Sequence, residues 1–130
     1  MKTASVDTNV LLRALIESDQ TLAARQLLGR PGCLFAVSHI VIAELVYVLG
    51  HHYRLNRPET AQATRRLLAV PSIVCDHEVI LAALNAFEAH PKLSFEACLL
   101  AEQASASNAI PLWTFDAKLA RQHPAAALVP

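Results

Sequence analysis

The stretch CLFAVSHIVIAELVYVL, residues 33–49, joins two apolar runs through a single serine. Residues 33–37 show no alternation of polar and apolar side chains, which predicts a strand that is covered on both faces. Ser38 can accept hydrogen bonds from the first N–H groups of a helix, so we expect it to cap a helix over about residues 39–53. Because that helix is apolar on nearly every side, we expect it to be buried.

The same order of a short apolar run and a helical pattern extends in both directions along the chain. Further strands are expected at 3–6, 72–75, 111–115 and 127–129, and further helices at about 10–15, 22–27, 58–68, 79–87, 94–107 and just after Asp116. Short strands that alternate with helices are typical of a parallel sheet between layers of helices. We therefore expect an α/β fold of three layers, with a central parallel sheet of four to five strands flanked by helices.

The composition is that of a single domain over residues 1–130. Apolar residues make up 54% and charged residues 17%, which excludes a disordered or collagen-like chain. The formal net charge is +0, whereas proteins held to nucleic acid by bulk charge are more basic, so a local site must hold any nucleic acid. Without a signal peptide or a long apolar run, we expect a cytoplasmic protein that does not span a membrane and whose cysteines (Cys33, Cys75 and Cys98) stay reduced.

Two aspartates follow predicted strands, Asp7 after the first and Asp116 after the fourth. In an open parallel sheet, ligands bind at the carboxyl ends of the strands. Aspartate at such a position is also a good helix N-cap, which is the alternative role of each residue. Two aspartates at strand ends that can converge favour a functional role.

Glu44 is a carboxylate in the middle of the apolar helix. Its helical neighbours at three and four positions are all large and mostly apolar: Ile40, Val41, Tyr47 and Val48. We therefore expect Glu44 to be shielded from solvent, and a buried carboxylate must meet a cation or a strong hydrogen-bond donor. The alternative to a functional role is an ion pair with an arginine such as Arg13.

Three carboxylates in one place repel each other, since a single pair about 4 Å apart costs about 4 kcal/mol at an effective dielectric near 20. A divalent cation removes that cost. Ligand sets made of oxygen alone favour Mg²⁺ or Mn²⁺ over zinc, and these ions keep waters that can attack a phosphodiester. The residues thus predict a metal-dependent site for phosphate chemistry at Asp7, Glu44 and Asp116.

Four segments together resemble the PIN domain, and more closely the VapC-type toxins of bacterial type II toxin–antitoxin pairs. They are VDTNVLLRAL at 6–15, SHIVIAELVYVL at 38–49, SFEACLLAEQA at 94–104 and PLWTFDAKLA at 111–120. The resemblance implies the same α/β fold and an Mg²⁺- or Mn²⁺-dependent ribonuclease that cuts RNA. It also implies a homodimer and a cognate VapB-type antitoxin that silences the enzyme.

By this resemblance, Asp7 matches the first acid of the family, Glu44 the second and Asp116 the fourth. The third acid stands in a stretch that resembles SFxDALLA, and here its place is taken by Ala97. Glu96 and Glu102 are poor substitutes, because neither shares the helix face of position 97. The loss implies weak or absent cleavage, either in a deliberately inactivated variant or in a naturally degenerate member of the family.

Other residues are candidates for substrate binding. Thr8 and Asn9 can donate to a phosphate from a helix N-terminus, and Thr114 can orient Asp116. Several arginines are candidates for an RNA path: Arg13, Arg54, Arg57, Arg65, Arg66 and Arg121. The segment 51–54 could stack on bases, and the apolar helices at 22–28 and 41–49 could supply a dimer or antitoxin surface.

Two other functions fit parts of the sequence. Ala97 favours a PIN-fold module that binds RNA or an antitoxin without cutting. A phosphoacceptor receiver domain also places acids at strand ends, but it needs a clustered acid pair after the first strand and a lysine at the end of the last core strand. Here Asp7 follows Val6, and Lys118 lies beyond the strand, in the predicted helix.

Overall fold

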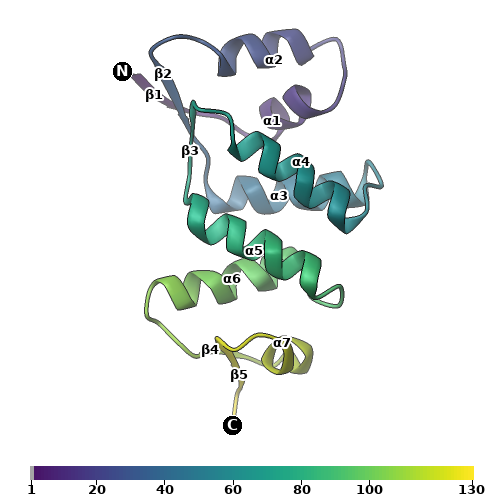
Figure 1. The fold of residues 1–130 in the computed structure, drawn as a ribbon, viewed down its shortest axis with the longest axis vertical. Coiled ribbons are helices and arrows are strands. Elements are labelled where there is room, and N and C mark those ends of the chain that lie inside the picture. Colours follow the sequence, from purple (N-terminus) through teal and green to yellow (C-terminus); the bar gives the residue numbers. More distant parts are fainter. Residues whose placement is uncertain (1) are drawn as a thin grey trace. The chain divides into compact units, whose positions relative to one another are not determined.

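The structure is a computed structural model that describes residues 2–130, and its chain divides into two compact units. The first unit ends at His77 and the second begins at Glu78. The first contains β1 (Lys2–Ser5), α1 (Thr8–Leu15), α2 (Thr21–Leu28), β2 (Cys33–Ala36), α3 (His39–His51), α4 (Arg57–Leu68) and β3 (Ile73–Val74) (Figure 1). The second contains α5 (His77–Ala89), which starts at the boundary, α6 (Phe95–Ala106), β4 (Leu112–Thr114), α7 (Ala117–Gln122) and β5 (Ala126–Leu128). A single-domain organisation stays a prediction.

Every strand pair in the two units is parallel, as the sequence predicts. The first unit has a three-stranded sheet in the order β1-β2-β3, in which Ser5 pairs with Ala36 and Ala36 pairs with Val74. The second unit has a two-stranded sheet of β4 and β5. The five expected strands are therefore present, but they form two separate hydrogen-bonded sheets where one central sheet was expected.

The expectation that the strands are covered on both faces is wrong for β1. All four of its residues are exposed, whereas Phe35 in β2 and Ile73 in β3 are buried. The reason is that β1 packs closely against β2 alone, so that in the described part of the chain no helix lies tightly over its faces.

Each predicted serine cap is confirmed. The Ser38 hydroxyl oxygen accepts a hydrogen bond from the N–H of Val41 at 3.3 Å, and that of Ser94 accepts from the N–H of Ala97 at 3.1 Å. The N-terminus of α4 has more capping hydrogen bonds than the sequence analysis predicted. Asn56 and Glu59 each accept from the other's backbone N–H, at 2.8 Å and 2.9 Å, which is a capping box.

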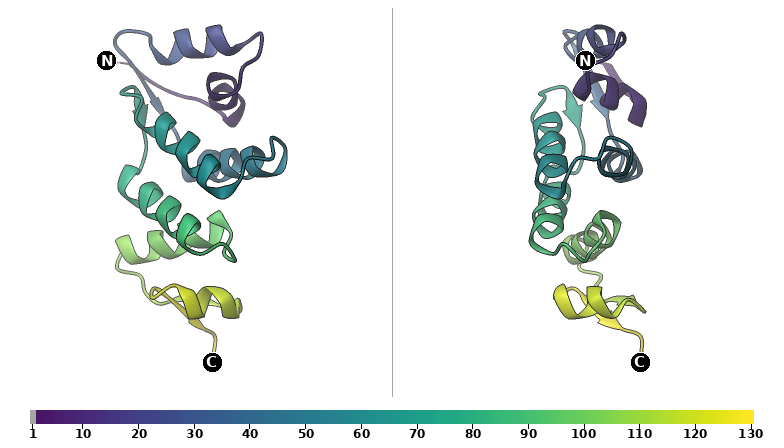
Figure 2. Two further views of the ribbon diagram at one scale, coloured as in Figure 1. Left: turned by 45° about the vertical axis from the view of Figure 1, so that its right-hand side comes forward. Right: turned by 90° about the vertical axis from the view of Figure 1, so that its right-hand side faces the viewer.

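Each unit has its own apolar core. In the first unit, α3 and α4 pack together, and Leu11, Leu45 and Leu49 are fully buried. In the second unit, α5 and α6 lie side by side (Figure 2), and Phe87 meets Phe95 edge to face with ring centroids 5.9 Å apart. No helix among residues 2–130 is long and apolar enough to cross a membrane.

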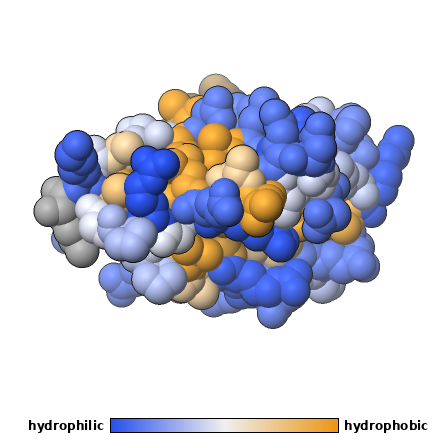
Figure 3. All heavy atoms as spheres, turned by 90° about the horizontal axis from the view of Figure 1, so that it is seen from above, coloured by the Kyte–Doolittle hydropathy of each residue, from blue (hydrophilic) through white to orange (hydrophobic). Residues whose placement is uncertain are grey.

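Large hydrophobic side chains are also exposed on several helices. They include Leu22 on α2, Ile40 and Tyr47 on α3, and Leu100 on α6. Figure 3 shows one face of the molecule on which hydrophobic residues gather in the middle, among hydrophilic ones. The use of such surfaces for a dimer or an antitoxin stays a prediction.

Replacing Asn56 with alanine should lower the free energy of unfolding by about 1 kcal/mol, because α4 loses the acceptor for one of its first N–H groups. Urea unfolding followed by circular dichroism measures this change. The matched control is Gln62→Ala, at an exposed position on the same helix, which should change stability by only a few tenths of a kcal/mol. Equal stability of the two variants would contradict the role of the capping box.

Candidate functional site

Asp7 lies at the carboxyl edge of the three-stranded sheet, two residues after the end of β1. Its Oδ1 accepts a hydrogen bond from the N–H of Val10 at 3.2 Å, so the expected N-cap role is real. The residue is nevertheless exposed, and within residues 2–130 its carboxylate makes no ion pair. The cap uses one oxygen, and Oδ2 remains free to bind a ligand.

Glu44 contradicts the expectation of burial. It is exposed on α3, between the exposed side chains of Ile40 and Tyr47 on the same helix face. Only the opposite side of α3, with Ile42, Leu45, Val46 and Leu49, packs into the core against α1 and α4. The alternative ion pair is also wrong, because Glu44 pairs with neither Arg13 nor any other cation in the part of the chain that the structure describes. Its carboxylate is open to solvent.

Asp116 belongs to the second unit, where it is the N-cap of α7. Its Oδ1 accepts from the N–H of Lys118 at 2.9 Å and of Leu119 at 3.2 Å. The Thr114 hydroxyl oxygen accepts from the backbone N–H of Asp116 at 3.0 Å. Thr114 therefore holds the turn that presents Asp116 and does not contact the carboxylate.

Thr8 and Asn9 begin α1 but differ in access to solvent. The Thr8 side chain is buried, whereas Asn9 is exposed. Asn9 can therefore donate to a ligand through its side chain, and Thr8 is left with its backbone N–H at the helix N-terminus.

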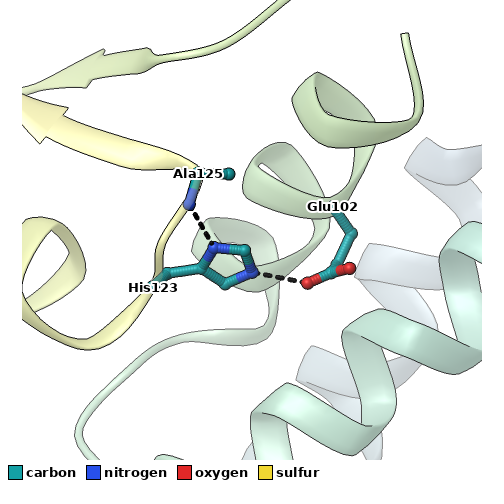
Figure 4. A network of polar contacts seen from close by, with 3 residues as sticks. All are labelled: Glu102, His123 and Ala125. Carbon is teal, nitrogen blue, oxygen red and sulfur yellow. Dashed lines mark hydrogen bonds and ion pairs between the residues drawn. The ribbon is translucent and has the colours of Figure 1, made fainter. Parts of the chain in front are cut away.

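Position 97 carries no metal ligand, and neither neighbouring glutamate replaces one. Ala97 is half-buried in the first turn of α6, and Glu96 beside it is exposed. Glu102 forms a hydrogen bond with Nε2 of His123, and the histidine is buried (Figure 4). The Nδ1 atom of His123 accepts from the N–H of Ala125 at 3.1 Å, so the ring proton must be on Nε2, from which it is donated to Glu102. Glu102 thus has a structural role.

The sheet edge holds a second aspartate that the sequence analysis missed. Ser5, Ala36 and Val74 are paired across the sheet, and Asp7, Ser38 and Asp76 each stand two residues later. The signal was available, because Asp76 follows a predicted strand as Asp7 does. Asp76 Oδ2 lies 3.6 Å from His39 Nε2, and both side chains are partly exposed.

Cys33, Cys75 and Cys98 form no disulfide, and of these three only Cys98 is fully buried. Cys75 is half-buried at the end of β3, next to Asp76. Burial, and to a lesser extent the negative charge of Asp76, raises the pKa of the Cys75 thiol.

The four positions that correspond to the acids of the family are divided between the two units. Asp7 and Glu44 belong to the first unit, and Asp116 and Ala97 to the second. Among residues 2–130 there is no group of three or more His, Cys, Asp or Glu side chains placed to hold a metal ion. Convergence of Asp7, Glu44 and Asp116 stays a prediction.

Replacing Glu102 with alanine should lower the free energy of unfolding by about 1–3 kcal/mol, because the buried Nε2–H of His123 loses its acceptor. Thermal or urea unfolding measures the loss. Glu96→Ala, at an exposed position on the same helix, is the control and should have little effect. An equally small effect of both substitutions would argue against a structural role of Glu102.

Replacing Asp76 with asparagine should make the Cys75 thiol react faster with iodoacetamide at pH 8, by about twofold or more, since removal of the negative charge lowers the pKa and increases the thiolate fraction. The rate is measured by mass spectrometry of the Cys75 peptide, with the Cys33 peptide of the same sample as internal control. An unchanged or slower rate at Cys75 would contradict the electrostatic effect of Asp76.

Comparison with known proteins places the chain in a family. A model of the PIN domain matches residues 4–123. A chain in the crystal structure of VapBC2 from Rickettsia felis, bound to a DNA fragment from their promoter, is similar with 23% identity and a TM-score of 0.40, over 99% of this chain and 98% of that chain. No curated protein matches the sequence. Because the family model covers nearly the whole chain, from β1 to the end of α7, this protein belongs to the PIN domain family.

Proposed function

We propose that this protein is built as a metal-dependent endoribonuclease, with Asp7, Glu44 and Asp116 as its catalytic acids. The observation that carries the proposal is the accessibility of the Asp7 and Glu44 carboxylates. Both carboxylates are exposed, and neither forms an ion pair with any residue from 2 to 130, in a protein of the PIN family. Exposure makes both carboxylates accessible to a ligand, and membership of the PIN domain family favours a catalytic use for them.

The donor chemistry of the three acids suits Mg²⁺ or Mn²⁺, because all of the donors are carboxylate oxygens. Asp7, Glu44 and Asp116 would hold the ion, although Asp7 and Asp116 each also cap a helix through Oδ1. When bound, the ion lowers the pKa of a bound water and stabilises negative charge on the scissile phosphate. The set is one acid short of the family pattern, because Ala97 supplies no oxygen.

Other residues of the chain would contact the substrate or position a catalytic acid. The first N–H groups of α1 and the exposed side chain of Asn9 can donate to the oxygens of an RNA phosphate. This attraction acts locally, which suits a chain of formal net charge +0. Thr114 keeps Asp116 at the start of α7 through the hydrogen bond to its backbone N–H.

The sequence resemblance to VapC-type toxins supports a finer proposal. The protein would act as the toxin of a type II pair, as a homodimer, and would bind a cognate VapB-type antitoxin in the cytoplasm. Ala97 then explains how a growth-inhibiting nuclease is tolerated, because loss of one acid lowers the affinity for the cation. An inactivated variant and a naturally degenerate toxin both fit this account.

Ala97 also favours a second candidate function. A PIN-fold module without the third acid could bind RNA or an antitoxin and leave the RNA intact. In that case the exposed acids would have no catalytic use, and a restored carboxylate at position 97 would not produce cleavage.

The deciding experiment measures the cleavage of single-stranded RNA by the Ala97→Asp variant in the presence of Mn²⁺. Restoring the carboxylate should raise the rate of cleavage by about 100-fold or more over the unsubstituted chain, because a missing ligand weakens both metal binding and chemistry. The rate is measured by gel electrophoresis of a labelled RNA, and EDTA should abolish it.

Two matched variants make the result specific. Ala106→Asp adds a carboxylate at an exposed position on the same helix and should not produce cleavage. Asp7→Asn combined with Ala97→Asp should remove the activity again. If Ala97→Asp remains inactive with Mn²⁺ and Mg²⁺ while correctly folded, the non-catalytic module is the better account.

A further inference from the structure

A pocket of about 420 Å³ lies between α1 and α2 and begins at Asp7. The two helices contact each other within the first unit (Figure 1). Asn9 and Arg13 line the α1 side, four residues apart and therefore on one helix face. Gln20 and Ala23 line the α2 side. The volume is within the usual range of sites for small ligands, about 300–1,000 Å³.

Of the polar side chains that line this pocket, Asp7 caps α1, while Asn9, Arg13 and Gln20 have no such role in the fold. Arg13 makes no ion pair with Asp7, with Glu44 or with any other carboxylate that the structure describes. Gln20 occupies the N-cap position of α2, yet its side chain makes no capping hydrogen bond. Asn9 is exposed. The pocket thus offers a guanidinium and two amides, each with unspent hydrogen-bonding capacity.

The remaining lining is small and apolar. It comes from Val10 of α1 and from three residues of α2. Ala23, Ala24 and Leu27 have the spacing of one face of that helix. A lining that combines apolar side chains with polar ones suits a ring that is apolar on its faces and polar at its edges.

We propose that this pocket binds one nucleotide of a single-stranded RNA, next to the phosphate that lies at Asp7. The proposal rests on the proposed nuclease function and adds a binding subsite to it. Arg13 holds the phosphate or stacks on the base, and the amides of Asn9 and Gln20 hydrogen-bond the base edge.

The charges of the pocket favour RNA over a protein occupant. An acidic peptide that reached Arg13 would also bring its carboxylates close to Asp7, which repels them. A nucleotide avoids this conflict, since its base is neutral and its phosphate meets the cation proposed at Asp7. Amide side chains, which both donate and accept, match the mixed edge of a base better than they match a carboxylate.

The test measures the binding of a fluorescein-labelled single-stranded RNA oligonucleotide of mixed sequence by fluorescence anisotropy in the presence of Mn²⁺. A gel run in parallel shows that the RNA stays intact during the measurement. Arg13→Ala removes the guanidinium, and Ala23→Phe places a large side chain in the pocket from an exposed position. Each should weaken RNA binding by about tenfold or more, the effect of losing a charge-assisted contact or the space for the base.

The controls carry the same changes outside the pocket. Arg30→Ala, in the turn after α2, and Ala106→Phe, on α6, should stay within about twofold of the unsubstituted chain, the effect of one non-specific phosphate contact or less. Circular dichroism and thermal unfolding show that all four variants are folded. In the Ala97→Asp background, the pocket variants should raise the KM for RNA and the control variants should not.

The outcomes separate this subsite from the proposed function. RNA binding that is equal in the pocket variants and the controls overturns the subsite, while cleavage by Ala97→Asp still supports the nuclease. Absence of RNA binding by the unsubstituted chain also overturns the subsite, and the nuclease falls with it only if Ala97→Asp does not cleave. The pocket variants can also be tested for binding of a purified antitoxin from a neighbouring gene. If they keep their affinity for RNA but no longer bind the antitoxin, the pocket belongs to that partner and the proposal is overturned.

Discussion

Parallel pairing of β1, β2 and β3 is the constraint on which the first unit's part of the candidate site depends. It places the ends of all three strands at one edge, with Ser5, Ala36 and Val74 in register. Two residues further along, Asp7, Ser38 and Asp76 occupy equivalent positions at that edge. A helix follows each of them, so the edge combines side-chain oxygens with helix N-termini. This combination is suited to cations and to phosphate at the same time.

Helix capping and ligand binding are compatible in such a place because a carboxylate has two oxygens. Asp7 and Asp116 each cap a helix through Oδ1. The cap fixes the side chain and so reduces the conformational entropy that binding would otherwise cost. Glu44 differs, since nothing in the described chain orders it and its helix face is open. The capped aspartates are thus preorganised, whereas Glu44 would have to be ordered by the proposed ligand.

The sequence predicted the elements well because their signals are local. Ser38 and Ser94 were correctly assigned as caps, since a hydroxyl before an apolar run acts within one turn of helix. The exposure of Glu44 was not predictable in this way. An apolar helix is expected to be buried all round, but how many of its sides are covered depends on its neighbours, and α3 packs on one side only. The same holds for the pairing of Glu102 with His123, which joins residues 21 positions apart.

The assignment of Asp7, Glu44 and Asp116 to one metal site is the central claim, and it joins residues of both units. The most direct measurement is the paramagnetic broadening of backbone amide signals by small amounts of Mn²⁺ in the unsubstituted chain, observed by NMR. The account predicts that the signals around residues 7, 44 and 116 broaden first and together, and that Asp7→Asn abolishes the effect at all three. Broadening at only one of these positions, or at scattered surface carboxylates, would contradict a shared site.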